Sequence, residues 1–77
     1  MLKNDEVIAR LEKKGIMIRS IQKLNKIMCC LGLIKKVNGL WTQTSKGMEF
    51  SPYKTNVLPA NEWNEDVVDY ISENYEE

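Results

Sequence analysis

The sequence predicts a small α+β domain in which helices pack against a short antiparallel hairpin, followed by an amphipathic C-terminal helix. Apolar residues recur at helical spacing in separate segments, and an Asn-Gly pair joins two short β-prone runs. The chain has 77 residues, which suffices for one domain with one hydrophobic core. We therefore expect a single domain, with a core over 5–50, a connector over 51–62 and a last helix over 63–75.

The first predicted helix covers residues 5–14. Its apolar stripe is formed by Val7, Ile8 and Leu11. Asn4 or Asp5 is the expected N-terminal cap, because a short polar side chain can accept a hydrogen bond from the first turn. Gly15 is expected to end the helix. The apolar connector over 15–19 could form a brief extended segment that pairs with a later sheet.

The second predicted helix has the clearest helical period in the chain and begins after Ser20, its expected N-cap. The apolar positions that carry this period are Ile21, Leu24, Met28 and Leu31. Gly32 is expected to close the helix as a C-terminal glycine. The opposite side of the helix collects Gln22, Lys23, Lys26, Cys29 and Cys30. Its N-terminal half is therefore polar and basic.

A β-hairpin is expected from residues 33–37 and 40–43, joined by Asn38-Gly39. Asn-Gly favours this turn because a type I′ turn needs positive φ at both central positions. The cross-strand pairs in that register are Val37 with Leu40 and Lys36 with Trp41. A two-stranded ribbon is marginally stable alone, so one face must pack on the helices.

The last predicted helix, over 63–75, is capped by Asn61 or Asn64. Its apolar face consists of Trp63, Val67, Tyr70, Ile71 and Tyr75. We expect this face to join the core and to cover Ile34 and Trp41. If the face found no room within the monomer, it would pair across a two-fold axis and form a homodimer.

The charge is divided between the two parts of the chain, although the total is zero. Residues 1–54 hold eleven Lys and Arg against four Asp and Glu, a balance of +7, whereas residues 55–77 hold seven acidic residues and no basic one. This asymmetry suggests a polyanion partner for the basic part. The alternative is that the acidic segment simply docks on the basic body.

Several function classes are excluded by what the sequence lacks. It has no histidine, and two cysteines alone cannot complete a tetrahedral zinc site. Motifs for phosphate loops, dinucleotide binding or serine hydrolysis do not occur, so we expect no enzymatic activity, cofactor or metal. No apolar run is long enough to span a membrane and no signal core is present, which favours the cytoplasm. Cys29 and Cys30 are interpreted as reduced thiols.

Residues 20–50, SIQKLNKIMCCLGLIKKVNGLWTQTSKGMEF, resemble the recognition-helix-and-wing segment of bacterial winged-helix regulators, and especially of phage antirepressor and phage regulatory proteins. The residues that carry the likeness are Ser20, Leu24, Asn25, Gly32, Leu33, Ile34, Gly39, Trp41, Thr44 and Gly47. The resemblance implies a winged-helix fold and a role in gene regulation. Such domains usually have two helices before the recognition helix, and the helix over 63–75 is a candidate to replace the missing one in space.

The function expected from these patterns is nucleic-acid binding by a regulatory module, with duplex DNA as the partner. The candidate nucleic-acid-binding residues are Ser20, Gln22, Lys23, Lys26, Lys35 and Lys36. Lys and Gln can reach base edges or phosphates, while a helix N-terminus favours phosphate. The alternative is a protein-interaction or dimerisation module on the same scaffold without DNA binding, because winged helices serve both roles.

Overall fold

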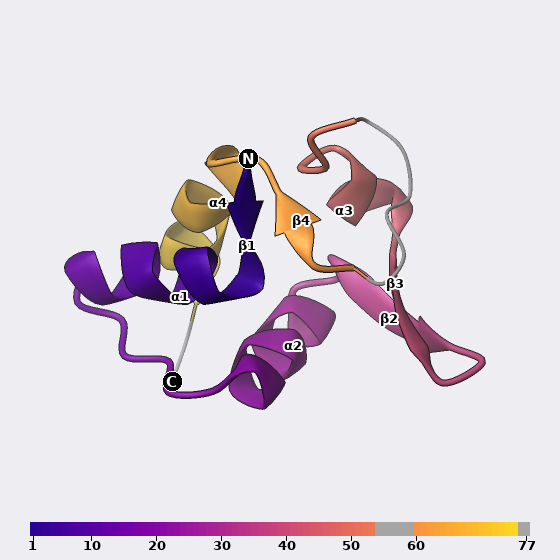
Figure 1. Cartoon of the computed structure of the whole chain (residues 1–77), viewed down its shortest axis with the longest axis horizontal. Coiled ribbons are helices and arrows are strands. Elements are labelled where there is room, and N and C mark those ends of the chain that lie inside the picture. Colours follow the sequence, from indigo (N-terminus) through magenta and orange to yellow (C-terminus); the bar gives the residue numbers. More distant parts are fainter. Residues whose placement is uncertain (54–59, 76–77) are drawn as a thin grey trace.

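A computed structural model describes residues 1–53 and 60–75 and confirms an α+β class (Figure 1). The elements in chain order are β1 (Leu2–Lys3), α1 (Asn4–Lys13), α2 (Ile21–Cys30), β2 (Ile34–Val37), β3 (Leu40–Gln43), α3 (Ser45–Met48), β4 (Glu62–Trp63) and α4 (Asp66–Asn74). Within this part of the chain the strands form two antiparallel pairs, β1 with β4 and β2 with β3. Residues 54–59 of the predicted connector lie outside the described residues.

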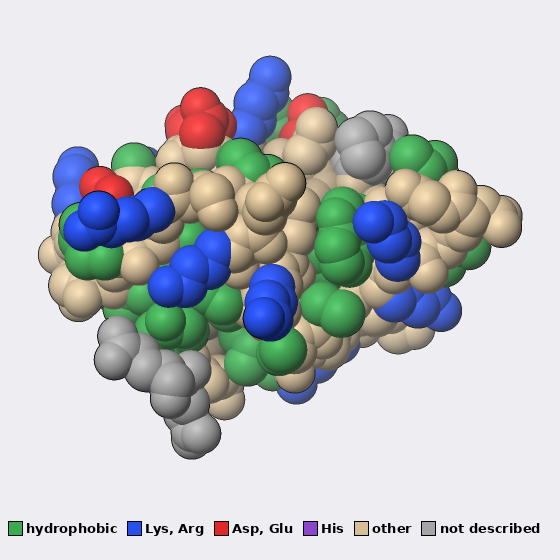
Figure 2. All heavy atoms as spheres, turned by 90° about the horizontal axis from the view of Figure 1, so that it is seen from below, with side chains coloured by type: hydrophobic (Ala, Val, Ile, Leu, Met, Phe, Trp, Pro, Cys, Tyr) green, Lys and Arg blue, Asp and Glu red, His purple; other side chains and the backbone are tan. Residues whose placement is uncertain are grey.

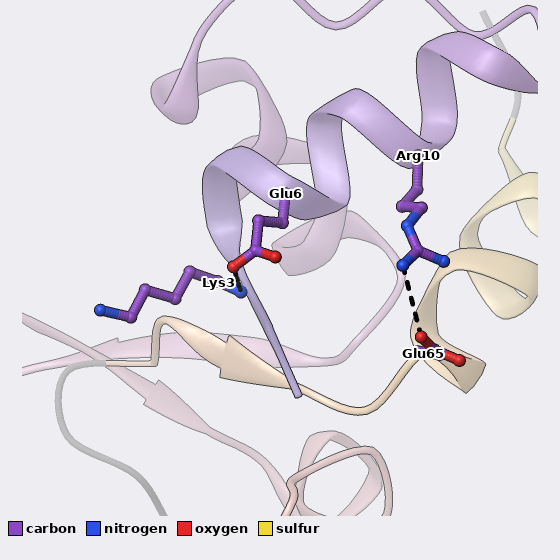
Figure 3. A network of polar contacts seen from close by, with 4 residues as sticks. All are labelled: Lys3, Glu6, Arg10 and Glu65. Carbon is purple, nitrogen blue, oxygen red and sulfur yellow. Dashed lines mark hydrogen bonds and ion pairs between the residues drawn. The ribbon is translucent and has the colours of Figure 1, made fainter.

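Helix α1 begins one residue earlier than predicted, and its cap differs from the expected one. Lys3 occupies the N-cap position, and its backbone N–H donates to Glu6 Oε1 at 3.3 Å (Figure 3). The prediction that Asn4 or Asp5 caps the helix is wrong, because Asn4 lies inside the first turn and is buried. Gly15 has a φ of +90°, which places it in the left-handed region that favours glycine after a helix.

The segment over 16–20 connects α1 to α2 without forming a strand, so the expectation that it pairs with a sheet is wrong. Its backbone is anchored to the preceding helix, since Ile16 N–H donates to Leu11 O at 2.9 Å. Ile18 is fully buried in the core. An irregular connector that buries Ile18 in the core takes the place of the expected sheet contact.

Helix α2 has both of its predicted ends. Ser20 is the N-cap, and its hydroxyl oxygen accepts from Lys23 N–H at 3.1 Å. Gly32 has a φ of +79° and its N–H donates to Cys29 O, as in a glycine-terminated helix. Leu24 is fully buried, as the apolar period predicts, whereas Ile21 at the first turn is 41% exposed.

The hairpin has the predicted register throughout. Val37 pairs with Leu40, and the intervening Asn38 and Gly39 have φ values of +50° and +80°, as a type I′ turn requires. Only one face of the ribbon is covered. At its base Ile34 and Gln43 are buried, whereas Val37 and Leu40 at the tip are 41% and 51% exposed.

The exit of α2, the end of the hairpin and α3 are joined through Thr44. Thr44 caps α3, and its hydroxyl accepts from Gly47 N–H at 3.1 Å while donating to Gly32 O. Its backbone N–H donates to Leu33 O at 3.0 Å. Gly47 packs so closely on this exit that a Cβ there would lie 1.9 Å from Leu33 O. The Thr-x-x-Gly turn therefore fixes where the hairpin leaves the helix.

The small sheet of β1 and β4 was not predicted. Leu2 pairs with Trp63 and Lys3 with Glu62. Trp63 therefore belongs to a strand, and the last helix covers Asp66–Asn74 rather than 63–75. The expected caps Asn61 and Asn64 are also wrong, because Glu65 holds the N-cap position without a side-chain hydrogen bond.

The C-terminal helix contributes to the same core as α1 and α2. Val67 and Ile71 of α4 are fully buried in a cluster that includes Leu11 and Leu24. The expected cover for the hairpin differs in detail, since α4 packs mainly on α1. The hairpin is instead bonded to the segment before the helix, where Ala60 N–H donates to Trp41 O at 3.0 Å.

Candidate nucleic-acid interface

The acidic part of the chain docks on α1. Arg10 Nη2 lies 3.4 Å from Glu65 Oε1, and Lys14 Nζ lies 3.2 Å from Asp69 Oδ1 (Figure 3 shows the first pair). Both pairs join α1 to the start of α4, and their side chains are about half exposed or more. Docking of the acidic segment on the basic body therefore does occur, and among the described residues its ion pairs lie at α1 and Lys14 and none reaches α2 or the hairpin.

The six predicted site residues lie on two consecutive elements and are all exposed. Ser20, Gln22, Lys23 and Lys26 belong to the start and middle of α2, and Lys35 and Lys36 belong to β2. Among residues 1–53 and 60–75, neither ion pair involves these four lysines. These four lysines are therefore exposed and form no ion pair with a described carboxylate.

The structure modifies the expected role of two of these residues. The Ser20 hydroxyl accepts the capping bond from Lys23 N–H, so its first task is to begin the helix. Lys36 Nζ lies 5.3 Å from the centre of the Trp41 ring. This cation–π contact holds the Lys36 side chain along the ribbon. Trp41 is half-buried and packs against the core.

On the side of the molecule where α2 lies, the charged side chains are mainly Lys and Arg (Figure 2). Figure 2 looks onto this side and shows Lys and Arg side chains spread across it among hydrophobic ones, with Asp and Glu only in its upper part. The basic residues therefore form a broad distribution, which suits an extended polyanion better than a single small ion.

A groove lies between α2 and the C-terminal end of α4, and sequence reasoning missed it. It has a volume of about 570 Å³ and is lined by Lys23, Lys26, Ile27, Cys30, Leu31, Asn74 and Tyr75. Lys23 and Lys26 were singled out from the sequence, but Asn74 and Tyr75 come from a distant helix end. Only the spacing of Lys23, Lys26 and Cys30 along one helix side hinted at a shared surface.

Within the described part of the chain, no three Cys, Asp or Glu side chains lie close enough together to hold a metal ion. Cys29 and Cys30 are free and exposed. No helix within residues 1–53 and 60–75 has both the length and the apolar character to cross a membrane.

Comparisons with models of protein families, with curated proteins and with solved structures found no match.

Proposed function

We propose that this protein is a nucleic-acid-binding regulatory module of the phage-regulator type, which binds duplex DNA on a winged-helix-like scaffold. In this proposal α2 is the reading helix and the β2–β3 hairpin is the wing. The cytoplasm is the compartment in which such a module would act. The proposal rests on the arrangement of charges and elements around α2.

The observation that carries the proposal is that the carboxylates of the acidic helix pair with Arg10 and Lys14, whereas the exposed lysines of α2 and the hairpin have no ion pair among the described residues. Glu65 and Asp69 face α1 through their ion pairs, while Lys23, Lys26 and the two hairpin lysines are exposed. A protein whose acidic segment merely neutralised its basic surface would bring those carboxylates onto α2. The remaining positive surface is available to phosphates.

The order of elements supports the same reading. Helices α1 and α2 are followed directly by the hairpin, and α4 packs on α1. In this proposal α4 would take the bracing position that an additional N-terminal helix usually fills in winged-helix domains, and its packing on α1 supports that role. The Thr44 hydroxyl bridges Gly32 and α3 and thereby fixes the hairpin relative to α2. A recognition helix and its wing would need such a fixed relative position to contact the same stretch of DNA.

Each candidate residue has a distinct expected role. Gln22 and Lys23, in the first turn of α2, would contact base edges or the adjacent phosphates, where the helix N-terminus also attracts anions. Lys26, Lys35 and Lys36 would contact the phosphate backbone, which positions the module without reading sequence.

The test is a titration of a fluorescent random-sequence duplex with the protein at low salt, followed by fluorescence anisotropy. The K35A/K36A variant should bind more weakly and should reduce the slope of log K against log salt by roughly two units, about 0.9 for each lost phosphate contact. The charge-matched control is K3A/K46A, whose lysines lie on β1 and α3. Absence of binding by the native chain up to about 100 μM at low salt would contradict the proposal.

A protein-interaction or dimerisation module is the second candidate, and one observation favours it. Val37 and Leu40 pair across the hairpin tip and remain 41% and 51% exposed. Exposed apolar pairs of this kind suit a protein partner or a second copy of the chain. Sedimentation of the native chain and of V37S/L40S distinguishes the candidates, since only a hairpin-mediated dimer would dissociate in the variant.

A further inference from the structure

We propose that the groove between α2 and the end of α4 binds a small amphipathic organic anion, a carboxylate carrying an aliphatic or aromatic body. We further propose that this ligand competes with DNA. The second statement rests on the proposed DNA-binding function, whereas the first does not. The groove is lined by seven residues whose chemistry divides into a basic rim and an apolar floor.

The basic rim provides the anion contact. Lys23 and Lys26 are three positions apart on α2, so their side chains are neighbours of like charge on one helix surface. Both are exposed, and the ion pairs among residues 1–53 and 60–75 leave both without a carboxylate. A carboxylate between the two ammonium groups would relieve their mutual repulsion.

The apolar floor explains why a simple inorganic anion is not the best ligand. Ile27, Leu31 and Tyr75 are partly buried and pack against the core while also lining the groove. Phosphate or chloride would leave these side chains in contact with water. A hydrocarbon or aromatic group removes that apolar surface from water, which is favourable in proportion to its area.

The size of the groove sets the size of the ligand. Small-molecule sites usually have volumes of roughly 300–1,000 Å³ and combine apolar walls with a few polar groups that fix orientation. The groove, at about 570 Å³, falls within that range. Asn74 is a neutral polar residue that also lines the groove, and its Nδ2 donates to Tyr70 O at 2.8 Å. A medium-chain carboxylate such as octanoate is therefore a suitable probe.

Competition with DNA follows from shared residues. Lys23 and Lys26 belong both to the groove and to the proposed DNA-binding surface, whereas Lys35 and Lys36 belong only to the latter. Cys30 and Tyr75 line the groove and are absent from the DNA set. The two binding events can therefore be separated by mutation.

Cys30 gives the groove its own reporter. In a C29S variant the remaining thiol lies in the groove, and in a C30S variant the remaining thiol, Cys29, is exposed but is not among the lining residues. The rate of alkylation by N-ethylmaleimide is measured in each variant with octanoate below its micellar concentration. Octanoate should slow alkylation of Cys30 several-fold and leave alkylation of Cys29 unchanged, while acetate and octanol at matched concentrations should slow neither reaction.

Isothermal titration of octanoate supplies the second measurement. The K23A/K26A variant should bind octanoate more weakly, by roughly two- to five-fold for each lost exposed charge contact. The K35A/K36A variant should bind octanoate with native affinity but should bind the DNA duplex more weakly than the native chain does. Octanoate should displace the duplex from the native chain more effectively than acetate at equal ionic strength.

The outcomes separate the two proposals. Equal protection of Cys29 and Cys30, or equal effects of acetate and octanoate, would overturn the groove site. Selective protection of Cys30 in a chain that binds no DNA would keep the groove site and refute the proposed DNA-binding function. Selective protection without any displacement of bound duplex would overturn the competition.

Discussion

The indole N–H of Trp63 donates a hydrogen bond to Asn4 Oδ1 at 2.9 Å, and the two residues are 59 positions apart in the chain. Trp63 is fully buried and Asn4 is 8% exposed. The bond joins the first turn of α1 to β4 at the point where Leu2 pairs with Trp63. A buried indole donor needs an acceptor, so this contact favours the pairing of β1 with β4.

Replacing Asn4 by alanine should lower the free energy of unfolding by about 1–3 kcal/mol, because the buried indole N–H loses its acceptor. Urea denaturation followed by tryptophan fluorescence measures the change. The matched control is Asn61→Ala at an exposed position, which should stay within about 0.5 kcal/mol of the native value. An Asn4→Ala variant as stable as the control would show that the hydrogen bond contributes nothing net.

Gly47→Ala tests the junction between α2 and α3. Its expected effect on stability is opposite to that of an ordinary Gly→Ala change in a helix. At an ordinary helix position alanine stabilises by about 1 kcal/mol relative to glycine. Here the new Cβ would lie 1.9 Å from the backbone oxygen of Leu33, which cannot turn away as a side chain could. We expect destabilisation of roughly 1–3 kcal/mol, read from the thermal midpoint, with Ser45→Ala as the exposed control in the same helix. A raised midpoint would contradict this account.

The features that could be predicted from the sequence are those specified by neighbouring residues. Ser20 caps α2 because its hydroxyl needs only the N–H three residues on. Asn38-Gly39 sets the hairpin register because the turn geometry fixes which residues face each other. The exposure of Gln22, Lys23 and Lys26 followed in the same way from the helix period.

The features that could not be predicted depend on contacts between distant residues. Trp63 continues the apolar period of the last helix, so a local reading extends that helix to include it. Its strand pairing with Leu2 involves only two residues on each side, too few for a recognisable β pattern. Asn4 was misjudged for the same reason, since its partner is the distant Trp63. The groove likewise needs Tyr75 beside α2, which no local pattern specifies.

Both cysteines should react as free thiols in the native protein. Cys29 and Cys30 are exposed and adjacent on α2, where neighbouring side chains point about 100° apart and a bridge would be strained. Thiol titration under native, non-reducing conditions should give the same value as in denaturant. A mass lowered by the two hydrogens that a bridge removes would contradict the prediction.

The segment over 60–75, which contains β4 and α4, should be indispensable to the fold because of the apolar side chains that it buries. Trp63, Val67 and Ile71 are fully buried, and burying each such side chain contributes about 1.5–3 kcal/mol. Their sum approaches the whole stability of a domain of this length, roughly 0.05–0.15 kcal/mol per residue. Truncation after Pro59 should therefore abolish the cooperative thermal transition followed by circular dichroism. The milder Ile71→Ala should cost about 2–5 kcal/mol, against less than about 0.5 kcal/mol for the exposed Glu73→Ala. A truncated chain that melts cooperatively at the native midpoint would show that the acidic helix is an appendage, and the core described for α1 and α2 would then have to close without it.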